Sequence, residues 1–156
     1  MSKAPNRGFT LVELVVTVAL IAILAALAAP SFRAFIADQQ VRTTANDLLV
    51  ALNYARSEAI KRNSAVTLQA VNGAWSEGWK ATATVGGAQV VLKEWDAPNS
   101  VSFDGTPTSF AFLANGRISG NVGGSLAVCK SEATKRTVNV DMSGLVSLKR
   151  SGACSG

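Results

Sequence analysis

The stretch GFTLVELVVTVALIAILAALAA, residues 8–29, decides how this chain is organised. Its apolar run, Phe9–Ala29, has only three polar side chains: Thr10, Glu13 and Thr17. An α-helix of this length rises about 31 Å, which matches the thickness of the hydrocarbon core of a bilayer. The run therefore predicts one membrane-spanning helix. The basic residues Lys3 and Arg7 precede it and indicate that this end lies in the cytoplasm.

Three kinds of segment fit such a run. A cleaved secretory signal peptide is one, because Ala26-Leu27-Ala28 is an A-x-A cleavage site, and a plain signal anchor is another. The third is a leader that is cut before the apolar run. Glu13 favours the third, because a carboxylate deep in the membrane costs about 2.5–3.5 kcal/mol and neither other segment uses one. A helix that packs against copies of itself could pair Glu13 with a cation from a neighbour.

Gly8-Phe9-Thr10-Leu11-Val12-Glu13, followed by an apolar helix, resembles the class III signal of type IV pilins and type II secretion pseudopilins. The resemblance implies that a prepilin peptidase cuts between Gly8 and Phe9 and that Phe9 is then N-methylated. It also implies that Glu13 pairs with an α-amino group freed by that cut. On this interpretation residues 1–8 are a cleaved leader and residues 9–29 are a transmembrane and assembly helix.

Beyond the membrane segment the sequence predicts that the helix continues. Pro30 removes one backbone hydrogen bond and bends a helix, and the resemblance suggests that this stretch extends or melts on assembly. Apolar residues then recur every three or four positions: Val41, Ala45, Leu48, Leu52, Ala55 and Ala59, with Leu49 beside them. Charged residues fall mostly elsewhere: Arg42, Asp47, Arg56, Glu58 and Lys61. This pattern predicts an amphipathic half, residues 30–62, that lies on a sheet.

From residue 63 the apolar pattern changes to a period of two. The expected strands are Ala65–Val71, Gly78–Val85, Gln89–Trp95, Val101–Phe103, Ser109–Leu113, Leu126–Cys129, Thr137–Val140 and Leu145–Leu148. Pairs such as Asn72-Gly73 and Gly86-Gly87 mark turns between them. We expect residues 63–156 to form an antiparallel domain of two small sheets on the helix. Its expected aromatic core is Trp75, Trp79, Phe103, Phe110 and Phe112.

The resemblance extends beyond the N-terminal motif. The helix end Tyr54–Asn63 and the cluster Trp75, Gly78 and Trp79 are similar to the GspH/FimT branch of pseudopilins and minor pilins. The implied fold is α+β and pilin-like, with a long N-terminal helix packed on a C-terminal β domain.

Composition excludes several classes of function. The chain has no histidine, which rules out Ser-His-Asp catalysis and histidine-ligated metal sites. Acidic residues show no paired spacing, so we expect no enzyme activity, no metal and no cofactor. Cys129 and Cys154 are the two cysteines. In an exported domain they predict one disulfide, whereas in a cytosolic protein they would stay unpaired.

The resemblance implies a bacterial inner-membrane protein with one span and a periplasmic domain. Its implied partners are the prepilin peptidase, other pilin or pseudopilin subunits and an inner-membrane assembly platform. The favoured function is a structural, priming minor pilin of a type IV pilus, because a disulfide near the C-terminus is typical of type IV pilins. A GspH-type pseudopilin of type II secretion is the alternative.

A third possibility is a pilus-tip subunit that binds DNA for uptake. The net charge of +5 is a weak argument for it, but five basic residues lie close together in the sequence: Lys130, Lys135, Arg136, Lys149 and Arg150. DNA-binding FimT-like proteins carry a Gly-Arg-x-Arg element near the C-terminus. The corresponding residues here, Ser143-Gly144-Leu145-Val146-Ser147, contain no arginine. We expect DNA contact only if the disulfide gathers the five basic residues on one face.

Overall fold

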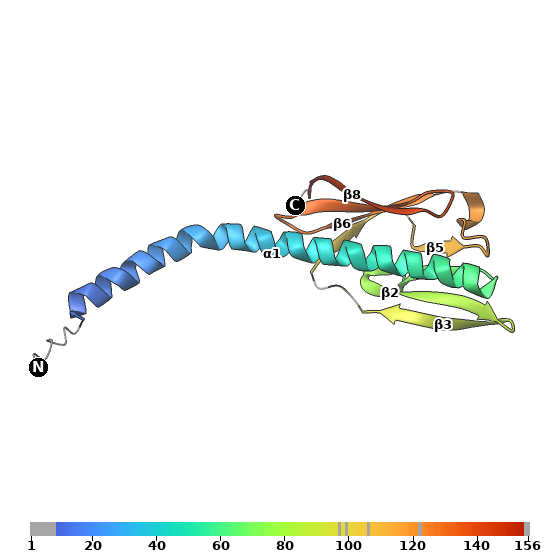
Figure 1. Cartoon of the computed structure of the whole chain (residues 1–156), viewed down its shortest axis with the longest axis horizontal. Helices are drawn as coiled ribbons and strands as arrows, with labels where there is room; N and C mark the ends of the chain where they lie inside the picture. The colour runs from blue at the N-terminus through green and yellow to red at the C-terminus, as the bar shows by residue number, and fades with distance from the viewer. Residues whose placement is uncertain (1–8, 97, 99, 106, 122, 155–156) are drawn as a thin grey trace, which may run out of the picture. The chain divides into compact units, whose positions relative to one another are not determined.

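The computed structural model describes residues 9–96, 98, 100–105, 107–121 and 123–154. The chain divides into two compact units, Met1–Ala34 and Phe35–Gly156, which are described separately. One helix, α1 (Leu11–Arg62), contributes to both, and the backbone of Pro30 belongs to it. A single helix from about residue 9 to Arg62 was expected, and this prediction is confirmed (Figure 1).

The described part of the first unit is the N-terminal half of α1 and the two residues before it. Thr10 caps the helix, because the backbone N–H of Glu13 donates a hydrogen bond to Thr10 Oγ1 at 3.2 Å. The spacing Thr-x-x-Glu is that of a capping box. The most apolar 18-residue window of α1 has a mean hydropathy of 2.8 and is wholly exposed, so α1 is long and apolar enough to cross a membrane.

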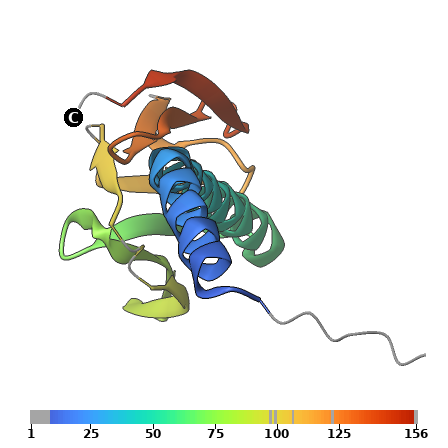
Figure 2. The same ribbon diagram turned by 90° about the vertical axis from the view of Figure 1, so that its left-hand side faces the viewer.

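The second unit is a helix with two four-stranded antiparallel sheets. The first sheet has the order β3-β2-β1-β5, and the second has the order β4-β6-β7-β8. Figures 1 and 2 show β2 and β3 on one flank of α1, and β6 and β8 on the other. The strands are β1 (Val66–Val71), β2 (Ala74–Val85), β3 (Ala88–Trp95), β4 (Ser102–Asp104), β5 (Ser109–Phe112), β6 (Gly124–Cys129), β7 (Thr134–Val140) and β8 (Val146–Ala153).

The core lies between α1 and the inner faces of both sheets. The predicted stripe of α1 is fully buried at Val41, Ala45, Leu48, Leu52, Ala55 and Ala59. It belongs to one cluster with residues of both sheets: Val66, Leu68 and Phe112 of the first, and Leu126, Val128 and Val138 of the second. The aromatic core is confirmed in four of its five members. Phe103 is only partly buried and packs with its ring edge-on to Trp79, with centroids 6.1 Å apart.

Three details differ from the expectation. β2 begins at Ala74 rather than Gly78, because it follows directly on the two-residue turn Asn72-Gly73, and a register shift against β1 then breaks the alternation. β7 and β8 are each longer than expected. Glu58 is buried rather than on the polar face, since its carboxylate accepts hydrogen bonds from Arg62 Nε at 2.7 Å and Lys61 Nζ at 3.4 Å. These bonds hold the pKa of Glu58 below its usual range.

Candidate functional site

The N-terminal motif falls partly within the described residues. Gly8, Lys3 and Arg7 lie outside them. Phe9 is 79% exposed, and Glu13 is exposed in the first turn of α1. The partial positive charge of a helix N-terminus favours a carboxylate there. In the described part of the chain no basic group forms an ion pair with Glu13, so an opposite charge has to come from elsewhere.

Thr10 is a residue of this site that the sequence analysis missed. Thr10 was expected only as a polar position of the apolar run, although the spacing Thr10-x-x-Glu13 is a recognised signal for a helix start. The cap fixes the first turn, and with it the position of Glu13 relative to Phe9. The cap therefore helps to keep Glu13 in the first turn of the helix, four residues after Phe9.

Large apolar side chains cover the helix after the motif, and all are at least half exposed. They are Leu11, Val12, Leu14, Val15, Val16, Val18, Leu20, Ile21, Ile23, Leu24 and Leu27. So many exposed apolar side chains in succession are not stable in water. Such a segment is suited to a nonpolar environment, such as lipid or the surface of another protein.

A charged junction joins α1 to the second sheet. Asp38 Oδ2 lies 3.6 Å from Arg136 Nη2, and Asp38 Oδ1 accepts a hydrogen bond from the backbone N–H of Thr134 at 3.3 Å. Arg150 Nη2 donates to Thr134 Oγ1 at 3.3 Å. Burial alone would raise the pKa of Asp38, but the Thr134 hydrogen bonds and the charges of Arg136 and Arg150 outweigh it and hold the pKa below its usual range.

The five basic residues proposed for DNA contact do not share a face. Arg136 lies opposite Arg150 in the register of β7 with β8, on the same sheet face as the buried Val138. Arg136 reaches Asp38 of α1, whereas Arg150 is exposed. Lys149 is opposite Thr137, so it points to the other face of the sheet, and Lys135 lies at an irregularity of the β7–β8 register. Lys130 follows β6 and donates to Gln40 Oε1 of α1 at 2.6 Å. The condition set for DNA contact, that all five lie on one face, is not met, because strand alternation separates neighbours in the sequence.

The two cysteines form the expected disulfide. Cys129 ends β6 and Cys154 follows β8, and their Cα atoms are 5.5 Å apart. In the sheet order β4-β6-β7-β8, the bridge therefore passes across the end of β7. The backbone N–H of Cys154 also donates to the carbonyl of Ala133 at 3.2 Å. The disulfide fixes the C-terminal end of the edge strand β8.

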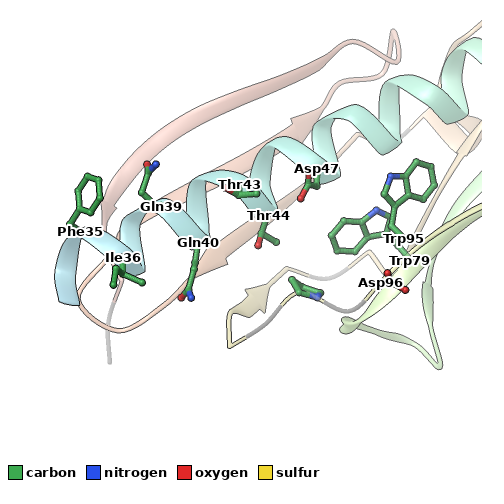
Figure 3. A pocket seen from close by; sticks show the side chains of 11 residues that line it. Phe35, Ile36, Gln39, Gln40, Thr43, Thr44, Asp47, Trp79, Trp95 and Asp96 are labelled. Atoms are coloured by element: carbon green, nitrogen blue, oxygen red, sulfur yellow. The ribbon is translucent and has the colours of Figure 1, made fainter. Parts of the chain in front are cut away.

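A groove of about 510 Å³ lies beside α1 in the second unit (Figure 3). We call it the α1 groove. One wall is the start of this unit's helix, with Phe35, Ile36, Gln39, Gln40, Thr43, Thr44 and Asp47, and the other is formed by Trp79, Trp95, Asp96 and Pro98. Trp79 was expected in the core. The sequence had no signal for the groove, because these segments meet only in the tertiary structure.

The turn that corresponds to the Gly-Arg-x-Arg element is held by Asp141. Its Oδ1 atom accepts hydrogen bonds from Ser143 Oγ at 2.6 Å, Ser143 N at 2.8 Å and Leu145 N at 3.0 Å. The bonds from Ser143 and Leu145 keep the pKa of Asp141 below its usual range. Met142 and Leu145 are 53% and 56% exposed there. The turn thus presents apolar rather than cationic side chains.

Comparison with known proteins agrees with this architecture. The family described as Type II transport protein GspH matches residues 44–144, and the prokaryotic N-terminal methylation motif matches residues 3–29. No curated protein sequence matches the chain.

Two kinds of solved structure share the fold. A crystal structure of the type IV minor pilin FimU of Pseudomonas aeruginosa has a TM-score of 0.63 at 21% identity, over 71% of this chain and 89% of that one. The minor pseudopilin EpsH of the type II secretion system of Vibrio cholerae has a TM-score of 0.58 at 10% identity, over 71% of this chain and 97% of that one.

The GspH match covers more than half of the chain, and the N-terminal methylation motif precedes it. An apolar helix with this motif is typical of inner-membrane prepilins. Such proteins are structural subunits rather than enzymes. The chain belongs to the GspH family and is a minor pilin or pseudopilin of a type IV pilus or a type II secretion machine.

Proposed function

We propose that this chain is a structural, priming minor pilin of a type IV pilus. The observation that carries the proposal is the exposed apolar half of α1, with one carboxylate, Glu13, in its first turn. Such a helix is suited to two environments in succession, the bilayer before assembly and a bundle of subunit helices afterwards. The compact β domain then lies outside the membrane, in the periplasm.

Processing and assembly use the two ends of the N-terminal motif. Prepilin peptidase cuts between Gly8 and Phe9, and the new α-amino group of Phe9 is methylated. Glu13 then pairs with the Phe9 amino group of a neighbouring subunit. Because the pair forms in a region of low dielectric, its attraction is stronger than in water and helps to set the register between adjacent helices. The other subunits and the inner-membrane assembly platform are the partners in this step.

The disulfide supports a pilus over a secretion machine, since a C-terminal disulfide is typical of type IV pilins. The family description favours the second candidate, a pseudopilin of type II secretion, because it is that of a type II transport protein. Both candidates use the same N-terminal motif, so the choice depends on which filament takes up the subunit.

The test is deletion of the gene in the native host, with two readouts in the same strain. One is the amount of pilin sheared from the cell surface, and the other is the activity of secreted enzymes in the medium. We expect fewer surface pili, unchanged secretion and recovery with the wild-type gene. Normal piliation with impaired secretion would reject the pilus in favour of the secretion machine.

A further inference from the structure

The α1 groove carries a local charge opposite to that of the chain. Among the described residues that line it, Asp47 and Asp96 are the charged ones, whereas the chain as a whole has a net charge of +5. Within the described residues neither carboxylate forms a hydrogen bond or an ion pair. The surrounding atoms partly desolvate Asp47 and raise its pKa. Both aspartate side chains are exposed, so each carboxylate is a solvated negative charge without a cation of the described residues in ion-pair contact.

The groove also has a hydrogen-bond donor without an acceptor. Trp79 is 2% exposed, and its Nε1–H has no partner among the described residues. By contrast, the indole N–H of Trp75 donates to the carbonyl of Pro107 at 2.8 Å. A buried polar group without a partner costs about 1–3 kcal/mol. The nitrogen is itself fully buried, so a carbonyl reaches it only when the indole shifts on binding, and the new bond then offsets that cost.

Apolar and aromatic surface completes the groove. Figure 3 shows Trp79 and Trp95 on the side of the groove opposite Thr44 and Asp47 of α1. Phe35 and Ile36 at the other end of the groove are 62% and 41% exposed. An aliphatic stem can pack on these side chains, and a cation can lie against an indole face.

We propose that the α1 groove binds an arginine side chain on an extended segment of a neighbouring filament subunit. The guanidinium lies between the carboxylates and the indoles, and a backbone carbonyl of the same segment accepts the N–H of Trp79. Arginine is suited to this site because its planar group both stacks on aromatic rings and donates to carboxylates. The inference rests on the proposed function, since only assembly places a second subunit beside this one.

Two lysines near the groove partly cancel the electrostatic potential of its carboxylates. Lys93 Nζ lies 4.9 Å from the centre of the Trp95 ring, and Lys130 Nζ is bound to Gln40. Neither lines the groove. They weaken the attraction of a distant cation, so selectivity for arginine has to come from direct contact. We therefore expect weak binding of a short peptide and a clear dependence on the guanidinium charge.

The test uses the full chain in detergent micelles with ¹⁵N-labelled tryptophan, which gives one indole N–H signal for each of Trp75, Trp79 and Trp95. The probe is the peptide acetyl-Ala-Arg-Ala-amide, and its matched control carries citrulline, a neutral isostere, in place of arginine. We expect the arginine peptide to move the Trp79 and Trp95 signals and leave the Trp75 signal in place. The citrulline peptide should bind about fivefold more weakly, the upper end of an exposed ion-pair contribution.

Two variants connect the binding to the groove. Asp47→Asn removes the negative charge without breaking a hydrogen bond or an ion pair of the described residues, so we expect the variant to fold. It should bind the arginine peptide about fivefold more weakly than the wild type. Asp104→Asn removes the same charge at the end of β4, away from the groove, and should bind like the wild type.

Equal affinity for the two peptides, or no movement of the Trp79 and Trp95 signals at millimolar peptide, would overturn the proposal. The titration needs no filament, so this failure would leave the role in assembly intact. A normal pilus count in the deletion strain would instead reject the pilus function and leave the peptide result standing.

Discussion

The disulfide Cys129–Cys154 should be a main source of stability for the β domain. The bridge closes a loop with a sequence separation of 25 residues. In the chain-entropy model such a loop lowers the entropy of the unfolded chain by about 12 cal/mol/K, which is about 3.5 kcal/mol at room temperature. For a folding unit the size of Phe35–Gly156, each kcal/mol corresponds to about 4 °C, so we expect reduction to lower the melting temperature by about 14 °C.

The structure also predicts which part of the β domain is destabilised first when the disulfide is reduced. The bridge joins the end of β6 to the chain after β8, and β8 is an edge strand with a neighbour on one side only. Without the bridge, the C-terminal end of β8 keeps its pairing to β7 but loses its covalent attachment. Backbone amides of residues 150–153 should therefore exchange with solvent sooner than those of β6.

The assay is thermal unfolding of the full chain in detergent, followed by tryptophan fluorescence. All three tryptophans lie in the second unit, so the signal reports on the β domain. The oxidised protein is compared with and without a reductant. The control is Cys129→Ser with Cys154→Ser, which should melt like the reduced protein and be insensitive to the reductant. A shift below about 3 °C would refute the entropic reasoning, and two free thiols in the native protein would remove the bridge altogether.

The remaining predictions concern processing, assembly, pH dependence and DNA. Gly8→Trp should block cleavage, since the peptidase needs a small residue before the cut; a mature form that still starts at Phe9 would contradict the leader. Glu13→Ala should insert and fold normally yet enter filaments poorly, measured as the subunit in sheared pili; normal incorporation would contradict the pairing. Asp38→Asn should cost about 1 kcal/mol of unfolding free energy at pH 7. The folded-state pKa of Asp38 is lowered, so the stabilisation by its carboxylate is present above about pH 4 and is lost as the pH falls through the folded-state pKa. A difference in stability between the variant and the wild type that persists at about pH 2 would contradict this explanation. Any DNA binding by the full chain should be weak and decrease steeply with salt, and the Lys135→Ala, Lys149→Ala double variant should abolish it; a gel shift unchanged by the double variant would place DNA contact elsewhere.

Much of this protein follows from local pattern. The apolar run with Glu13 specified the exposed half of α1, and the three-and-four spacing specified its buried stripe. The change of period after Asn63 specified the strands. These features depend on which side chains recur along one element, and this information is local to the sequence. Even the missed cap at Thr10 was present as a spacing.

The tertiary structure decided what depends on partners distant in the sequence. The register of β7 with β8 put Arg136 and Arg150 on one face of the sheet, where Arg136 meets Asp38, and put Lys149 on the other face, which the charge count could not distinguish. The α1 groove exists only because the middle of β2, at Trp79, and the end of β3, at Trp95, lie beside the first turns of this unit's helix. A sequence pattern predicts on which face of its own helix or strand a residue lies. Which faces meet is determined by packing of the whole chain, and only that packing could leave Asp47 and the indole of Trp79 unpaired in one groove.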